Sequence, residues 1–192
     1  MKANNSIKVT ILALAFGAFS ATAQDKNTDK HTIDIKIPEV AILDLETTGQ
    51  SGVIALEGTA PTEAGNALDF SKATNSELWI NYSSIIGKRS EPTREVTVQI
   101  TTGDVPSGME ILVEAAKDAG KGEGTVGTPA GQLKLSTSAQ KIITGVGSVY
   151  TGNGANAGHN LTYKMQLATG KYGDIDFDQT GSITVTYTLS DN

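Results

Sequence analysis

The chain has 192 residues, a net charge of −6 at pH 7 and no cysteine, and 5% of its residues are aromatic. An acidic chain repels nucleic acid and anionic lipid, so neither is expected as a partner. The lack of cysteine excludes disulfides, a cysteine nucleophile and thiolate metal sites, so hydrophobic burial or pairing with a partner must hold the fold together.

The first residues have the layout of a secretory signal peptide. Lys2 and Lys8 form a positive segment, residues 9–19 are mostly apolar, and residues 21–23 (ATA) offer a small-residue cleavage site. The apolar run is too short to cross a hydrocarbon core of about 30 Å, and no cysteine follows it for lipid attachment. We therefore expect cleavage after Ala23, export to the bacterial cell surface or beyond, and no membrane span in the mature protein.

The mature chain shows short runs of alternating apolar and polar residues, separated by clusters of Gly, Asn, Asp and Pro. These runs predict strands over residues 33–37, 40–45, 53–56, 78–82, 96–100, 109–115, 132–135, 141–144, 161–167 and 183–189. Such alternation is typical of antiparallel sheets with one face on the core. We predict an all-β, Ig-like sandwich of about 8–10 strands over residues 32–192, after a flexible arm over residues 24–31.

Two glycine-rich stretches, residues 117–131 and 145–158, are expected to be loops. Neither matches the phosphate-binding pattern GxxxxGK[ST], and neither has the strand–GxGxxG–helix context of a dinucleotide site. No nucleotide or other cofactor is therefore expected.

The sequence contains no recognisable catalytic constellation. Its two histidines, His31 and His159, lack a GxSxG motif, and the simplest interpretation makes both solvated. They are also too few for a zinc site without cysteine. Carboxylates are plentiful, but nothing selects a pair for glycoside hydrolysis. We therefore expect a protein that is not an enzyme, with no catalytic residues, and a hydrolase is the least favoured alternative.

Asp174, Asp176 and Asp178 form a weak calcium candidate. Carboxylates at every second residue share one face of an extended segment, and calcium prefers oxygen ligands. The spacing differs from the calcium loop of helix–loop–helix proteins, so a solvated acidic turn, with Ile175 and Phe177 turned inward, is the favoured interpretation.

Trp79 and Tyr82 could provide a platform for carbohydrate. Both lie in a well-formed strand pattern in a chain that is poor in aromatics. A buried or half-buried Trp79 is therefore the favoured interpretation.

The segment from His31 to Leu45 suggests an edge strand near the N-terminus, with Ile33, Ile35 and Ile37 on one face. It could be the first strand of its own sandwich. It could instead complete the sheet of a neighbouring copy, and such head-to-tail exchange builds a filament.

The sequence DKHTIDIKIPEVAILDLETTG, from Asp29 onward, resembles the mature N-terminus of colonisation-factor-type fimbrial major subunits. The closing segment is similar too, with GKY at residues 170–172 before an alternating strand over residues 181–189. The middle, with VPSGM at residues 105–109 and LTY at residues 161–163, resembles small secreted Ig-like domains of unassigned function in Bacteroidetes-type bacteria. The likeness spans most of the mature chain as a pattern.

This resemblance implies a pilin-like fold and donor-strand assembly, with Ile33, Ile35 and Ile37 as the inserting residues. Our leading hypothesis is a non-catalytic extracellular structural subunit of a fimbrium or surface matrix involved in cell adhesion, whose partners are its own copies or other envelope proteins. The alternative is a monomeric secreted binding module for a glycan or an envelope protein, which would use residues 145–159.

Overall fold

The computed structural model describes residues 27–49, 52–179 and 181–191, in two units. Residues 27–36 belong to the first unit and form no helix or strand. Residues 37–192 form the second unit, which holds every strand found in the described residues. The proposed signal peptide lies outside the described residues. No helix in the described ranges is long and apolar enough to cross a membrane.

The described residues of the second unit form nine strands and one short 3-10 helix, and every strand pair is antiparallel. The strands are β1 (Val40–Thr47), β2 (Thr74–Ile85), β3 (Arg94–Thr102), β4 (Met109–Asp118), β5 (Glu123–Pro129), β6 (Leu133–Lys134), β7 (Gln140–Tyr150), β8 (His159–Leu167) and β9 (Thr184–Asp191), and the 3-10 helix is η1 (Tyr172–Asp174). The prediction of an all-β, sandwich-like fold with about 8–10 strands is therefore confirmed.

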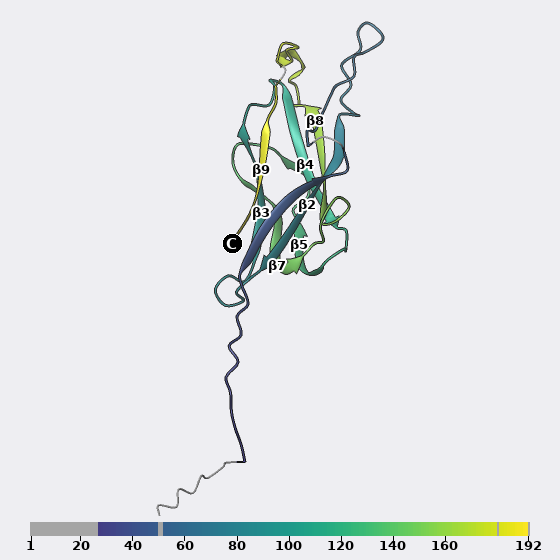
Figure 1. Cartoon of the computed structure of the whole chain (residues 1–192). Helices are drawn as coiled ribbons and strands as arrows, with labels where there is room; N and C mark the ends of the chain where they lie inside the picture. The colour runs from purple at the N-terminus through teal and green to yellow at the C-terminus, as the bar shows by residue number, and fades with distance from the viewer. Residues whose placement is uncertain (1–26, 50–51, 180, 192) are drawn as a thin grey trace, which may run out of the picture. The chain divides into compact units, whose positions relative to one another are not determined.

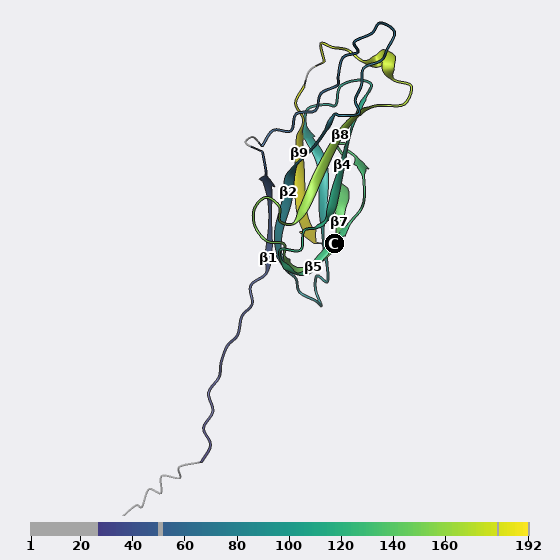
Figure 2. The same cartoon turned by 90° about the vertical axis from the view of Figure 1, so that its right-hand side faces the viewer.

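The strands form two layers that are joined through β2. The pairing order is β6-β4-β8-β2-β7-β3-β9, with β1 added to β2 and β5 added to β7. The beginning of β2 pairs with β8, but Ser83 and Ser84 near its end pair with β7. The sheet therefore folds over at β2, with β1, β2, β8, β4 and β6 in one layer and β5, β7, β3 and β9 in the other (Figures 1 and 2).

Alternation along the strands builds the core between the layers. Leu78, Ile80 and Tyr82 of β2 point inward, as do Val96 and Val98 of β3, and none of the five is more than 8% exposed. Burial of such side chains contributes about 1.5–3 kcal/mol each, and equally buried side chains from β4, β7 and β8 complete the core.

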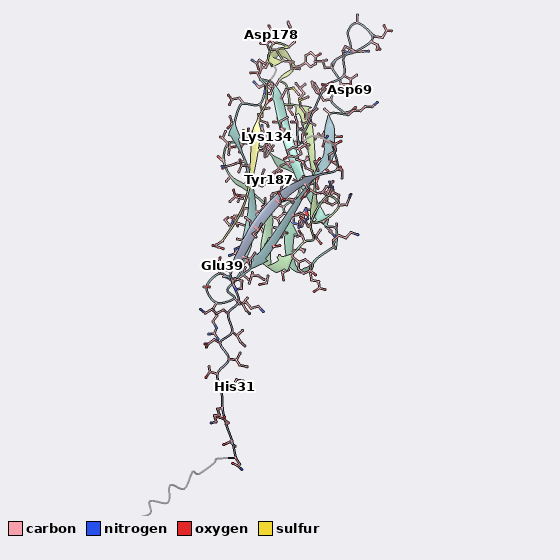
Figure 3. All side chains as sticks on the ribbon, viewed as in Figure 1. His31, Glu39, Asp69, Lys134, Asp178 and Tyr187 are labelled. Carbon is pink, nitrogen blue, oxygen red and sulfur yellow. The ribbon has the colours of Figure 1, made fainter. Side chains whose placement is uncertain are left out.

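A pair of tyrosines connects the two layers inside the core. The hydroxyl groups of Tyr163 on β8 and Tyr187 on β9 lie 2.7 Å apart, and both side chains are buried. Figure 3 labels Tyr187 within the strands. Burial raises the pKa of both hydroxyl groups, so they stay protonated at neutral pH and one can donate to the other.

The prediction that residues 117–131 and 145–158 are loops was only half right, since β5 lies in the first stretch and β7 extends through Tyr150 in the second. The glycines here allow two backbones to approach closely. A Cβ atom at Gly122 would lie 1.6 Å from the carbonyl oxygen of Tyr150. The predicted strand over residues 53–56 does not form.

Replacing Gly122 by alanine should lower the free energy of unfolding by about 2–3 kcal/mol, because the added methyl group forces the β5–β7 backbones apart. Gly173→Ala is the matched control, since neither glycine has a positive φ and a Cβ at Gly173 meets nothing within 4 Å. It should change stability by less than about 0.5 kcal/mol. Urea unfolding of the two variants tests this, and equal midpoints would contradict the close approach.

Candidate functional site

The isoleucines predicted to be the assembly strand are exposed. Ile33, Ile35 and Ile37 have exposed fractions of 71%, 82% and 78%, and residues 28–39 belong to no strand. The first strand begins only at Val40. Residues 33–37 therefore form no strand in the described structure, whereas residues 40–45 of the same predicted segment belong to β1.

The side of the sandwich between β1 and β9 is incompletely closed. Among the described strands, β1 pairs only with β2 and β9 pairs only with β3. The register places Ala41, Leu43 and Leu45 of β1 on the core face, yet Ala41 and Leu45 are exposed and Leu43 is half-buried. Val185 and Leu189, on the core face of β9, are also half-buried. Both edge strands therefore leave core-facing apolar side chains partly open to water.

Arg94 closes one end of this open side. Its side chain is 1% exposed, and its Nε donates to Asp191 Oδ1 on β9 at 2.7 Å. Its Nη1 donates to the carbonyl oxygens of Val40 and Ile85 and to the hydroxyl of Ser84. One guanidinium thereby connects the start of β1, the end of β2, the start of β3 and the end of β9.

Three carboxylates surround this guanidinium. Glu39 pairs with Nη2, Glu91 lies 3.5 Å from it, and Asp191 pairs with Nε. Oxygens of the three groups lie within 4.8 Å of one another, so three negative charges share one positive charge. Repulsion from Asp191, and then from Glu39, outweighs the attraction of Arg94 and raises the pKa of Glu91.

The sequence analysis did not identify Arg94, although its position carried a signal. Arg94, Val96 and Val98 occupy alternate positions of one strand, so the alternation that places the valines in the core also places the arginine there. A charged residue in phase with a buried face predicts an internal ion pair.

His159 is fully buried, so the expectation of a solvated loop histidine was wrong; His31 is exposed, as expected. The Nδ1 of His159 lies 2.8 Å from the carbonyl oxygen of Ala116, and its Nε2 lies 2.7 Å from the hydroxyl of Tyr82. That hydroxyl donates its one proton to the carbonyl oxygen of Val126. Burial raises the pKa of Tyr82, which keeps its hydroxyl available as a donor. These contacts connect several strands within the core. The ring nitrogens of His159, at the start of β8, thus satisfy polar groups that water cannot reach.

The acidic segment with Asp174, Asp176 and Asp178 is an exposed turn that includes η1. Asp174 pairs with Lys171 at 3.0 Å, and Asp176 accepts a hydrogen bond from the backbone of Asp178. These three carboxylates are not brought together in the way that Glu39, Glu91 and Asp191 are. The turn lies at the opposite end of the domain from Glu39 (Figure 3).

The expectations for the neighbouring apolar and aromatic residues had different outcomes. Ile175 is half-buried as expected, but Phe177 is 89% exposed, so the prediction that it turns inward was wrong. Trp79 is half-buried and Tyr82 is buried, which agrees with the interpretation that neither forms an exposed platform.

No protein-family model matches the chain, and neither a curated protein nor a solved structure is similar to it.

Replacing His159 by phenylalanine should lower the free energy of unfolding by about 1–3 kcal/mol. The ring volume is kept, but the carbonyl of Ala116 and the hydroxyl of Tyr82 each lose a buried partner. His31→Phe, at an exposed position, should change stability by less than about 0.5 kcal/mol. Chemical denaturation of both variants measures the difference, and equal losses would show that the buried contacts contribute nothing.

Replacing Glu91 by glutamine should stabilise the fold at neutral pH, because glutamine does not repel Asp191 and Glu39. The folded-state pKa of Glu91 is raised above its ordinary value of 4.5. Protonation of Glu91 therefore adds to the stability of the wild-type fold below that value, and this added stability is lost as pH rises through the folded pKa. The advantage of the variant should therefore grow from about pH 4.5 upward and vanish below it.

Thermal midpoints of the wild type and Glu91→Gln across this pH range test the sign of the effect. Glu63→Gln, at an exposed position outside the cluster, is the control and should show no such dependence on pH. A variant that is less stable than the wild type at neutral pH would mean that the attraction between Glu91 and Arg94 dominates instead.

Proposed function

We propose that the protein is a non-catalytic, extracellular structural subunit of a bacterial surface filament or matrix, pilin-like in fold, which assembles by giving residues 33–37 to a neighbouring copy. The observation that carries the proposal is the exposure of Ile33, Ile35 and Ile37, at 71%, 82% and 78%. Three isoleucines at every second position suit a strand with one buried face. Left in water they would form an unpaired, aggregation-prone edge.

The open side between β1 and β9 is the acceptor that we propose for this strand. An inserted strand would cover Leu43 and Leu45 of β1 and Leu189 of β9, and it would pair with a free strand edge. Because the donor segment and the acceptor side are different segments of each copy, the exchange is head-to-tail. Such contacts propagate into an open chain of subunits.

The free energies of burying and ordering the donor segment show why stable association depends on the acceptor side. Full burial of three isoleucines contributes about 5–9 kcal/mol, and ordering five residues costs about 5–10 kcal/mol, so these two effects nearly cancel. Stable association therefore depends on the additional covering of the acceptor's own half-buried leucines and valine and on the new backbone hydrogen bonds.

Replacing Ile35 by aspartate should abolish filaments while leaving the monomer folded and exported, because a buried carboxylate would stand at the centre of the inserted strand. Thr32→Asp introduces the same charge in the same arm on the opposite face, and it should assemble normally. Electron microscopy and unheated denaturing gels report filaments and heat-sensitive ladders. Normal filaments from Ile35→Asp would refute the proposal, as would a clean monomer from the wild type.

A mixing experiment separates the donor from the acceptor. Leu45→Asp should impair acceptance and leave the arm intact, whereas Ile35→Asp impairs only donation. Neither variant should assemble alone, but a mixture should form heterodimers and nothing longer. Circular dichroism and thermal unfolding verify that Leu45→Asp is folded. Failure of the folded pair to form heterodimers would exclude the open side between β1 and β9 as the acceptor.

A further inference from the structure

A hollow of about 280 Å³ lies on the outer face of β1 and β2, beside the end of β7. Tyr82 contributes to it from β2, and Gly152 contributes from the loop that follows β7. The other residues around it are Ile42, Asp44, Asn81, Ser83, Tyr150 and Asn153. The loop residues come from the stretch 145–159 that the sequence analysis named as a binding surface.

Strand register builds the apolar wall of the hollow. Ile42 on β1 pairs with Ser83 on β2, which in turn pairs with Tyr150 on β7. The small serine therefore lies between two larger apolar side chains. Ile42 is 64% exposed and Tyr150 is 50% exposed, so both leave apolar surface available to a ligand.

The polar groups of the hollow lie two residues further along the same register. Asp44 pairs with Asn81, and Asp44 is exposed. The side-chain amide of Asn153 and the hydroxyl of Tyr150 make no hydrogen bond to the described residues of the chain. The hollow thus combines an aromatic wall with a carboxylate and free polar side chains, and it has no cationic lining residue.

Asn81 holds the loop that follows β7 beside the hollow. It is 4% exposed, and its Nδ2 donates to the carbonyl oxygens of Gly154 at 3.2 Å and Ala157 at 3.3 Å. Because both partners can only accept, the orientation of the amide is fixed, and Oδ1 is the acceptor. Oδ1 has no hydrogen-bond partner among the described residues. Because this oxygen is fully buried, a ligand in the hollow cannot contact it directly, and Asn81 contributes by holding the loop in place.

We propose that this hollow binds one saccharide ring. The apolar face of a sugar would pack against Tyr150 and Ile42, and its hydroxyl groups would donate to the carboxylate of Asp44 and accept from the side-chain amide of Asn153. The volume is at the lower limit for small-molecule sites, which suits a single ring. The carboxylate and the lack of a cation disfavour phosphate and other anions.

A larger hollow, about 430 Å³ around Lys88, Thr93 and Ser148, does not carry this inference. Its lining residues include the cation Lys88 but no aromatic ring and no carboxylate. The saccharide site stands independently of the assembly proposed above, because Ile42 and Asp44 lie on the face of β1 opposite to the core-facing Leu43 and Leu45. A monomer and a filament subunit would both retain it.

NMR titration of the ¹⁵N-labelled mature chain tests the inference. The probes are glucose, galactose, mannose, N-acetylglucosamine and fucose, added separately. At least one sugar should shift the side-chain amide signals of Asn81 and the backbone signals of Tyr150. Tyr150→Ala and Asp44→Ala should each weaken that binding by about tenfold or more, equivalent to about 1.4 kcal/mol. Phe177→Ala, which removes an aromatic ring that is 89% exposed elsewhere, should leave the affinity unchanged.

The inference is overturned if no sugar of the panel shifts these signals, or if Tyr150→Ala binds as well as the wild type. It is also overturned if the signals respond only to unlabelled protein, since the hollow would then be a contact between copies. Using Ile35→Asp as the labelled chain separates the two proposals, because saccharide binding by this variant does not require assembly.

Discussion

The buried guanidinium of Arg94 holds together the end of the domain where the chain enters it. Removing an arginine from water costs several kcal/mol, and the cost is recovered only when most of its donors find well-placed acceptors. Here two backbone carbonyls, one hydroxyl and carboxylates from separate segments supply those acceptors. The carbonyl of Val40 is one of them, so the guanidinium binds the first residue of β1. Without disulfides, this ion-pair cluster is a cross-link between the layers.

The position of that cluster explains why one side of the sandwich stays incomplete. β1 and β9 are connected through Arg94 at one end, but along the rest of their length each has only one pairing partner among the described strands. Leu43 and Leu189, which belong to the core by register, are consequently half-buried. Nearer the centre of the core, the Tyr163–Tyr187 hydrogen bond and the buried valines hold the two layers together. The core is therefore well packed at its centre and open at one flank.

Alternation predicted the fold class and most strands, because period-two burial follows directly from strand geometry. It failed where backbone approach decides the structure: residues 123–129 contain glycines that suggest a loop, yet β7 lies close enough that a side chain at Gly122 would clash. The site was less predictable. The exposed isoleucines could be found from local pattern, whereas the burial of His159 depends on Tyr82 and Ala116, which are distant in sequence. Such long-range satisfaction of polar groups leaves no local signal.

The residues from Ile37 to Val40 bear on whether the arm could fill the open side of its own copy. Folding back beside β1 would need a tight turn just before Val40, whose carbonyl Arg94 holds. Two-residue hairpin turns require positive φ at one or both central residues, which Gly and Asn supply. Pro38 fixes φ near −65° and restricts Ile37 to extended conformations, and Glu39 is paired with Arg94. Local sequence therefore opposes self-insertion, which supports the proposal that a neighbouring copy accepts residues 33–37.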